Sequence, residues 1–78
     1  MEIKILVWEA RNQKGMSEEE LAEKSGVSKS TIQRIEAGKT SPSINKLGKI
    51  AEALGLKIED LFNATYNYNN SDDEEQQI

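Results

Sequence analysis

The fold is decided by residues 17–42, which read SEEELAEKSGVSKSTIQRIEAGKTSP. Ser17 followed by Glu20 is a capping-box pattern, which predicts that a helix begins here. Gly26 is predicted to end this helix, because glycine adopts the left-handed backbone conformation of a helix C-terminus at little steric cost. Ser28 is a second N-cap residue and begins the next helix. The stretch therefore predicts two short helices separated by a tight turn.

The apolar residues of this stretch predict how the two helices cross. Ala22 is small, which lets the helices approach closely at the roughly 90–120° that is typical of a helix-turn-helix. Ile32 and Ile35 form the inner face of the second helix, which Gly38 ends. A generic pair of helices also contains a glycine and apolar residues. No single position is diagnostic. A helix-turn-helix is indicated by the combination of these residues with two N-caps, each at the correct distance before its helix.

Residues 17–62 resemble the phage repressor and Cro-type helix-turn-helix domain of bacterial transcriptional regulators, also called XRE-like. The most specific matching pieces are AxxxGVSxSTIxRIExGK and LxKIAxALG, and the resemblance covers about residues 3–62. It implies an all-α, compact five-helix domain of the lambda-repressor type, which usually binds paired DNA half-sites as a dimer. We therefore predict a DNA-binding domain over residues 1–63 and an acidic, flexible tail over residues 64–78.

The resemblance further implies that the second helix of the motif, residues 29–37, is a recognition helix lying in the major groove of DNA. Arg34 is suited to a bidentate contact with guanine, and Lys29 can reach guanine or a phosphate. Without the motif, the same residues would be a solvated polar face. The residues to which the resemblance assigns DNA contacts are Glu18, Ser28, Lys29, Ser30, Thr31, Gln33, Arg34 and Lys39.

The chain departs from the pattern of the family in three respects. Glu18 stands where family members usually have a Gln that touches a phosphate, and Ala37 stands where many have Asn. Thr40 and Ser41 occupy loop positions where some members carry Arg or Lys. Each difference removes a phosphate contact or adds a repulsion, and phosphate contacts supply much of the affinity for DNA. We therefore expect weak binding by a monomer.

The resemblance also implies a structural ion pair between Arg11 and Glu36. Matching positions in repressors carry an Arg that pairs with the Glu at the end of the recognition helix, and both residue types are present here. The alternative is two solvated surface charges, which would contribute almost nothing to stability.

The composition excludes several classes of protein. The chain of 78 residues contains no Cys and no His, so it lacks a thiolate, the usual general base and the commonest metal ligand. We expect no enzyme activity, catalytic residue, metal, cofactor or small-molecule ligand. No segment approaches the roughly 18–20 apolar residues of a membrane span, and no signal-peptide pattern opens the chain. The expected location is the cytoplasm.

The net charge of −4 is unusual for a protein that binds nucleic acid. All ten basic residues precede Asn63, together with ten of the fourteen acidic residues, so the predicted domain is neutral. The four remaining acids form one block in the tail: Asp72, Asp73, Glu74 and Glu75. A neutral domain can still bind DNA where its cations gather on one face.

The N-terminal segment, residues 2–14, has two interpretations. Ile3, Ile5 and Val7 alternate with other residues, which suits a strand. The resemblance favours a first helix that ends at Gly15, and this is our prediction. The inward residues of that helix would be Ile3, Leu6, Val7 and Ala10.

The C-terminal part of the domain predicts two further helices. Ser43 is the N-cap of the first, and Gly55 ends it. Its apolar residues recur at helical spacing: Ile44, Leu47, Ile50, Ala51 and Leu54. A short last helix is expected over Ile58–Asn63. The family often forms its dimer contact at this end, which makes surface on Leu56, Ile58 or Phe62 a candidate.

The tail is polar and acidic, a composition typical of disorder. Tyr66 and Tyr68 are its only large anchors. A helix over residues 2–14 leaves Ile5 and Trp8 on a face of their own. These two side chains either widen the core or form an apolar patch for a partner subunit or the tail.

The sequence thus predicts a sequence-specific, repressor-like regulator that binds double-stranded DNA as a homodimer on an inverted-repeat operator. The alternative is a protein-interaction module that has kept the fold and binds DNA weakly or not at all. Glu18 and the neutral charge of the domain favour this alternative.

Overall fold

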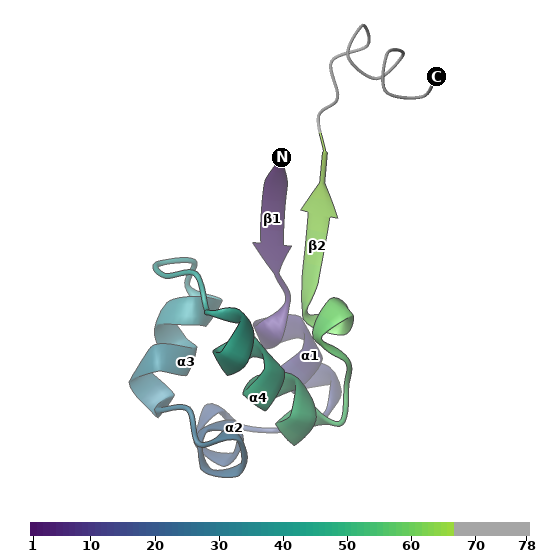
Figure 1. Ribbon diagram of the computed structural model, residues 1–78. Helices are drawn as coiled ribbons and strands as arrows, with labels where there is room; N and C mark the ends of the chain where they lie inside the picture. The colour runs from purple at the N-terminus through teal and green to yellow at the C-terminus, as the bar shows by residue number, and fades with distance from the viewer. Residues whose placement is uncertain (67–78) are drawn as a thin grey trace, which may run out of the picture.

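The structure, a computed structural model, describes residues 1–66. Four helices pack into one body, and two strands project from it as a ribbon (Figure 1). The elements are β1 (Glu2–Ile5), α1 (Val7–Gln13), α2 (Glu18–Ser25), α3 (Lys29–Glu36), α4 (Ile44–Leu54), the 3₁₀ helix η1 (Ile58–Leu61) and β2 (Phe62–Thr65). Within residues 1–66, no helix has the length and apolar character needed to cross a membrane.

Serine side chains begin three of the four helices, as the sequence predicts. The hydroxyl oxygen of Ser17 accepts the backbone N–H of Glu20 at 3.0 Å, and the Glu20 carboxylate accepts the backbone N–H of Ser17 at 3.3 Å, which completes the capping box. The hydroxyl oxygens of Ser28 and Ser43 cap α3 and α4 by accepting the backbone N–H groups of Thr31 and Lys46. Each cap satisfies a backbone donor that the helix itself leaves free, which typically contributes about 1 kcal/mol.

The core lies where α1, α2, α3 and α4 meet. Its largest fully buried side chains are Val7, Leu21, Ile32, Ile50 and Leu61. Val27, between α2 and α3, is also buried, and its backbone N–H donates to the hydroxyl of the buried Ser25 at 3.1 Å. That bond satisfies a polar group that would be costly to bury alone. Ala22, expected on the same inner face, is half-buried.

The prediction of five helices was wrong, because both ends of the domain are strands. β1 pairs with β2 in an antiparallel register that places Ile3 opposite Ala64 and Ile5 opposite Phe62. These four side chains share one face of the ribbon, since alternate residues of a strand point to the same side. The alternation was the correct signal for Ile3 and Ile5, whereas Val7 begins α1. It was ambiguous because the partner strand lies at the far end of the domain.

The helix predicted over Ile58–Asn63 is also shorter than expected. Its first part is the 3₁₀ helix η1, which ends at Leu61, and the chain then extends into β2. At the base of the ribbon, the backbone N–H of Leu6 donates to the carbonyl oxygen of Leu61 at 2.8 Å. The predicted boundary at residue 63 remains a prediction, and β2 continues to Thr65.

The pairing of the strands changes the burial of the N-terminal segment. Val7 and Ala10 are buried, as predicted for the first helix. Ile3, however, retains 55% of its surface because it lies on the ribbon rather than on a helix. Trp8 is 53% exposed and therefore does not simply widen the core. Tyr68 lies outside the described residues, as does any docking of the tail beyond residue 66.

Candidate nucleic-acid interface

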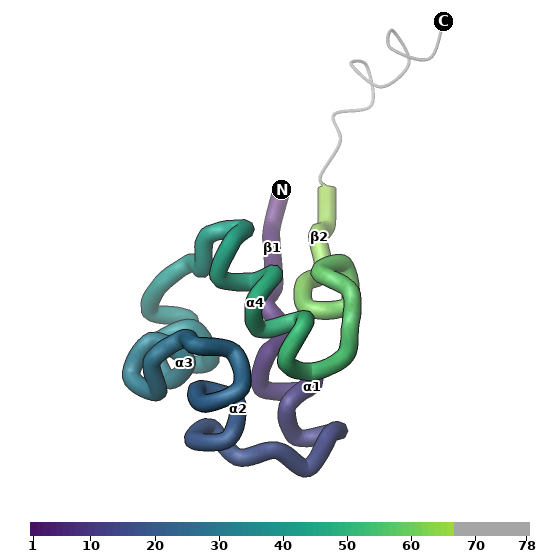
Figure 2. The backbone as a smooth tube through the Cα atoms, turned by 60° about the horizontal axis from the view of Figure 1, so that its bottom comes forward, coloured from purple at the N-terminus to yellow at the C-terminus, as the bar shows by residue number. Residues whose placement is uncertain are grey.

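Helix α3 divides cleanly into an inner and an outer face. Ile32 and Ile35 are buried at 0% and 2% exposure and fix α3 to the body. The outer face carries four exposed side chains: Lys29, Ser30, Gln33 and Arg34. The helix lies on the outside of the helical body in both views (Figure 1 and Figure 2). Its outer face is therefore open to a partner as large as a DNA duplex.

The first turn of α3 contains a network of short polar side chains. The Ser28 hydroxyl accepts the backbone N–H of Thr31 at 3.2 Å and donates to the Thr31 hydroxyl at 2.8 Å. Arg34 donates from Nη2 to the same Thr31 oxygen at 3.3 Å. This contact directs the exposed guanidinium of Arg34 toward the N-terminal part of α3. That is the part of a recognition helix that meets base edges.

Glu18 is connected directly to the outer face of α3. The Gln33 side-chain amide donates from Nε2 to Oε1 of Glu18 at 3.2 Å. This hydrogen bond lowers the pKa of the Glu18 carboxyl, and the positive charges of Arg11 and Lys29 lower it further. Glu18 is therefore ionised at neutral pH and brings a negative charge to the edge of the predicted DNA surface.

A second acid at the start of α2 also reaches α3. The ammonium group of Lys29 lies 3.4 Å from Oε1 of Glu19, and both side chains are largely exposed. Sequence reasoning missed this pair, because the spacing along the chain does not show that the N-termini of α2 and α3 are close. Lys39 is exposed in the loop after α3, where its backbone N–H donates to the carbonyl of Arg34 at 2.9 Å.

Behind the outer face, the expected pair of Arg11 and Glu36 forms with bidentate geometry. Arg11 donates from Nε to Oε2 of Glu36 at 2.7 Å and from Nη2 to Oε1 at 3.0 Å. Its remaining nitrogen, Nη1, donates to the carbonyl of Met16 at 3.0 Å. The two side chains are only 11% and 6% exposed. The hydrogen bonds to Glu36 raise the pKa of Arg11. Together, the bonds to Glu36 and Met16 connect α1 with the end of α3 and with the α1–α2 loop.

The described residues hold no other cluster that suggests chemistry. Within residues 1–66, no group of three or more Asp and Glu side chains is placed to bind a metal ion. The site is therefore a polar surface on one helix, with a buried ion pair behind it.

Comparison with known proteins agrees with this geometry. A family model described as "Helix-turn-helix" matches residues 9–61. A protein of Methanothermobacter thermautotrophicus named as an uncharacterized HTH-type transcriptional regulator is 44% identical over 61 residues, covering 77% of this chain and 88% of its own. The HTH-type transcriptional regulator SinR of Bacillus licheniformis is 44% identical over 54 residues, which are 68% of this chain and 49% of that protein.

A solved structure shares the arrangement of the helices. The crystal structure of the restriction-modification controller protein C.AhdI from Aeromonas hydrophila superposes with a TM-score of 0.67 at 33% sequence identity. The match covers 69% of this chain and 82% of the controller protein. With a family model that spans more than half of its residues, the chain belongs to the helix-turn-helix family of transcriptional regulators.

Proposed function

We propose that this protein is a sequence-specific transcriptional regulator that binds double-stranded DNA by placing α3 in the major groove. The observation that carries the proposal is the outer face of α3. Lys29, Gln33 and Arg34 are exposed there on a helix whose inner face is fixed by buried isoleucines. These side chains can donate to base edges, and Arg34 has the fork geometry that guanine accepts.

The charges around α3 favour a site that selects among DNA sequences over one that binds any DNA tightly. Lys29, Arg34 and Lys39 supply cations, whereas Glu18 and Glu19 bring two acids to the same region. The non-specific part of DNA affinity depends on neutralised phosphates. Weak binding by one copy follows, and a homodimer on an inverted repeat would offset it. The same two acids are the observation in favour of a protein-interaction module.

Selection of bound sequences from random duplex DNA at low salt tests the proposal. Enrichment of one motif by the folded protein is the expected result, followed by a dissociation constant for that motif measured by fluorescence anisotropy. A folded protein that enriches no sequence and binds no duplex would favour the protein-interaction module instead.

The selected sites should be inverted repeats with half-sites centred about 34–36 Å apart, one turn of the duplex. The reason is that a single short recognition helix reads few base pairs, so two copies are needed for selectivity. Footprinting on a full site and on an isolated half-site checks this. Full affinity for one half-site would contradict a dimeric mode of binding.

Replacing Glu18 with glutamine should strengthen DNA binding by about 0.5–1 kcal/mol at low salt, the scale of an exposed charge pair. Glutamine keeps the acceptor for Gln33 and removes the charge that a nearby phosphate would meet. The gain should shrink as salt rises, because exposed charges are screened. Titrations at two salt concentrations measure it, with Glu23→Gln, an exposed change on α2, as the matched control.

The same substitution should slightly lower stability. The pKa of Glu18 is depressed in the folded protein, so its stabilisation is present above the ordinary carboxyl pKa and is lost as pH falls through the folded value. The carboxylate also lies at the positive end of α2. Thermal melts at neutral and acid pH should therefore separate Glu18→Gln from wild type only at neutral pH. Unchanged DNA affinity at low salt would show that Glu18 faces away from DNA.

A further inference from the structure

The outer edge of β1 is open. Among residues 1–66 the sheet has two strands, so β1 pairs with β2 along one edge only. The ribbon projects from the helical body, and the described chain places no third strand beside β1 (Figure 1). An open edge offers unpaired N–H and C=O groups to another strand. This edge is therefore available for pairing with another strand.

The register shows which backbone groups face outward. The β1–β2 register ends with Ile5 opposite Phe62, so Leu6 and Leu61 are the next opposing residues. The backbone N–H of Leu6 donates to the carbonyl oxygen of Leu61, which makes these two residues a hydrogen-bonded pair. In an antiparallel pair, hydrogen-bonded and non-hydrogen-bonded positions alternate. Lys4 and Glu2 are consequently bonded to β2. The N–H and C=O groups of Ile3 point to the open edge.

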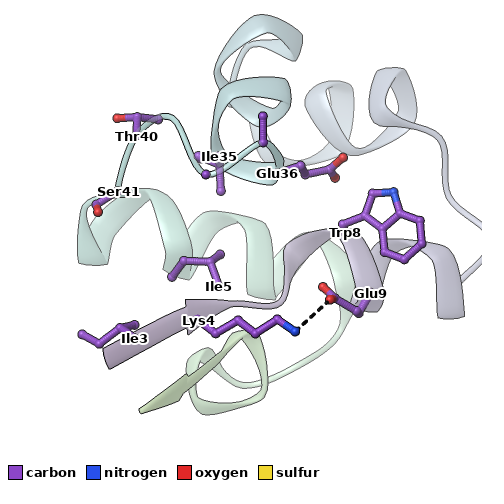
Figure 3. Close-up of a pocket in the computed structure, with 11 residues that line it drawn as sticks. Ile3, Lys4, Ile5, Trp8, Glu9, Ile35, Glu36, Thr40 and Ser41 are labelled. Atoms are coloured by element: carbon purple, nitrogen blue, oxygen red, sulfur yellow. Dashed lines mark ion pairs between the residues drawn. The ribbon is translucent and has the colours of Figure 1, made fainter. Parts of the chain in front are cut away.

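A cavity of about 600 Å³ lies between β1, α1 and the loop before α4. Ile3 and Ile5 line it from β1, and Trp8 lines it from α1 (Figure 3). Thr40 and Ser41 form its far wall. Lys4 of β1 and Glu9 of α1 also line the cavity, and the Lys4 ammonium lies 3.9 Å from Oε2 of Glu9 (Figure 3). The space beside the inner half of the β1 edge is thus large enough to receive an incoming side chain, and its β1 and α1 walls carry both apolar and charged side chains.

The charges of β1 identify the occupant as a second copy of β1. The strand reads Glu2-Ile3-Lys4-Ile5, so opposite charges stand on either side of Ile3. An antiparallel strand of the same sequence centred on Ile3 would place Glu2 of each copy directly opposite Lys4 of the other. We propose that two copies of this chain associate by pairing their β1 edges about a two-fold axis at Ile3, giving one four-stranded sheet.

Other registers are less favourable for electrostatic reasons. A two-fold axis at Lys4 would place two lysines opposite each other, and an axis at Glu2 would do the same for two glutamates. Like charges directly opposite are destabilising, whereas opposite charges contribute roughly 0.2–1 kcal/mol for each pair. By the same alternation, the backbone groups of Ile5 also face outward, so hydrogen bonding permits an axis at Ile3 or at Lys4. The charges then select the axis at Ile3.

The proposed pairing also covers apolar surface. Ile3 and Met1 are 55% and 67% exposed in the single chain. In the dimer, Ile3 would face Ile3 of the second copy. Met1 of the second copy would lie opposite Ile5, beside the cavity. The two helical bodies would then lie at opposite ends of the shared sheet. The role of this dimer in DNA binding rests on the proposed function, whereas the pairing of the two strands does not.

Single-cysteine variants test the register, because the chain has no cysteine of its own. In the proposed sheet the two Cα atoms of residue 3 are about 5.5 Å apart, which lies within the disulfide range. Ile3→Cys should therefore give a disulfide-linked dimer under mild oxidation. Lys4→Cys is the matched control, since its two Cα atoms would be about 8 Å apart, beyond disulfide reach.

Charge exchange tests the same pairing in the 78-residue chain without oxidation. Glu2→Lys places lysines opposite each other in both pairs, and Lys4→Glu does the same with glutamates. Each should raise the dimer dissociation constant at least about tenfold in sedimentation equilibrium, because two attractive pairs become repulsive. An equimolar mixture of the two variants should recover association, since every opposing pair is then complementary. Glu23→Lys, on α2, should change nothing.

Three results would overturn the proposal: a monomeric wild-type protein at every concentration, cross-linking of Lys4→Cys as fast as Ile3→Cys, or a dimer unaffected by either charge exchange. The last result would place the interface elsewhere, for example at Leu56, Ile58 and Phe62. DNA binding by α3 is measured separately, with Arg34→Ala on a half-site. A failure of the β1 interface can therefore be distinguished from a failure of DNA recognition.

Discussion

Replacing Arg11 with methionine should lower the free energy of unfolding by about 3–5 kcal/mol, because it leaves the Glu36 carboxylate buried without a partner. The carboxylate is 6% exposed and accepts two hydrogen bonds from Arg11 at 2.7 and 3.0 Å. The substitution also leaves the carbonyl of Met16 without its side-chain donor. Chemical denaturation at neutral pH, with the unfolding slope compared between variants, measures the loss.

The double mutant is the decisive control for this ion pair. Glu36→Gln should also destabilise the fold, since it removes the charge that the buried guanidinium of Arg11 requires. The double mutant Arg11→Met/Glu36→Gln should lose less than the sum of the two single changes, because no isolated charge remains. Lys29→Met is the matched exposed control and should cost only about 0–1 kcal/mol. Small and additive losses at Arg11 and Glu36 would mean that the pair contributes little.

Replacing Arg34 with alanine should weaken DNA binding by about 1–3 kcal/mol and relax selectivity at one base pair. The guanidinium is exposed on the outer face of α3, and its contact with Thr31 at 3.3 Å directs it toward the start of the helix. A bidentate contact to guanine is specific for one base, so its loss should affect one position of the site. Affinities for the selected site and for its single-base variants measure both effects.

Two controls separate the role of Arg34 from general electrostatics. Lys39→Ala removes a cation from the loop after α3 and should weaken binding uniformly across sequences, as loss of a phosphate contact does. Lys24→Ala, exposed on α2, should have a smaller effect. Thermal melts of all three variants should match wild type, because these side chains are outside the core. A uniform loss for Arg34→Ala would assign it to a phosphate rather than a base.

The helix-turn-helix was predictable because its signals are local. A serine that caps a helix and a glycine that ends one act over three or four residues, so Ser17 and Gly26 can be recognised without knowing the fold. The caps at Ser28 and Ser43 formed as predicted for the same reason. The spacing of Ile32 and Ile35 similarly fixes which side of α3 is buried. The outer face then follows as the remainder of the helix.

The site was only partly predictable. Its residues on α3 follow from the motif, and the pair of Arg11 and Glu36 came from the resemblance to repressors rather than from any local rule. The contact of Gln33 with Glu18 and that of Lys29 with Glu19 join two helices. These contacts depend on the angle and position at which α2 and α3 cross, and the spacing of residues in the sequence does not predict them.

By itself, the sequence determined the caps, the ends and the buried stripes of the helices, because these depend on neighbouring residues and on a period of 3.6 residues. Only the tertiary structure decided that residues 2–5 are a strand. Their sequence is compatible with a strand and with the start of a helix. The strand forms because these residues make backbone hydrogen bonds with Phe62–Thr65 at the other end of the domain. A strand needs a partner to satisfy its backbone, whereas a helix satisfies its own. The same dependence leaves β1 with an edge that is open in the single chain.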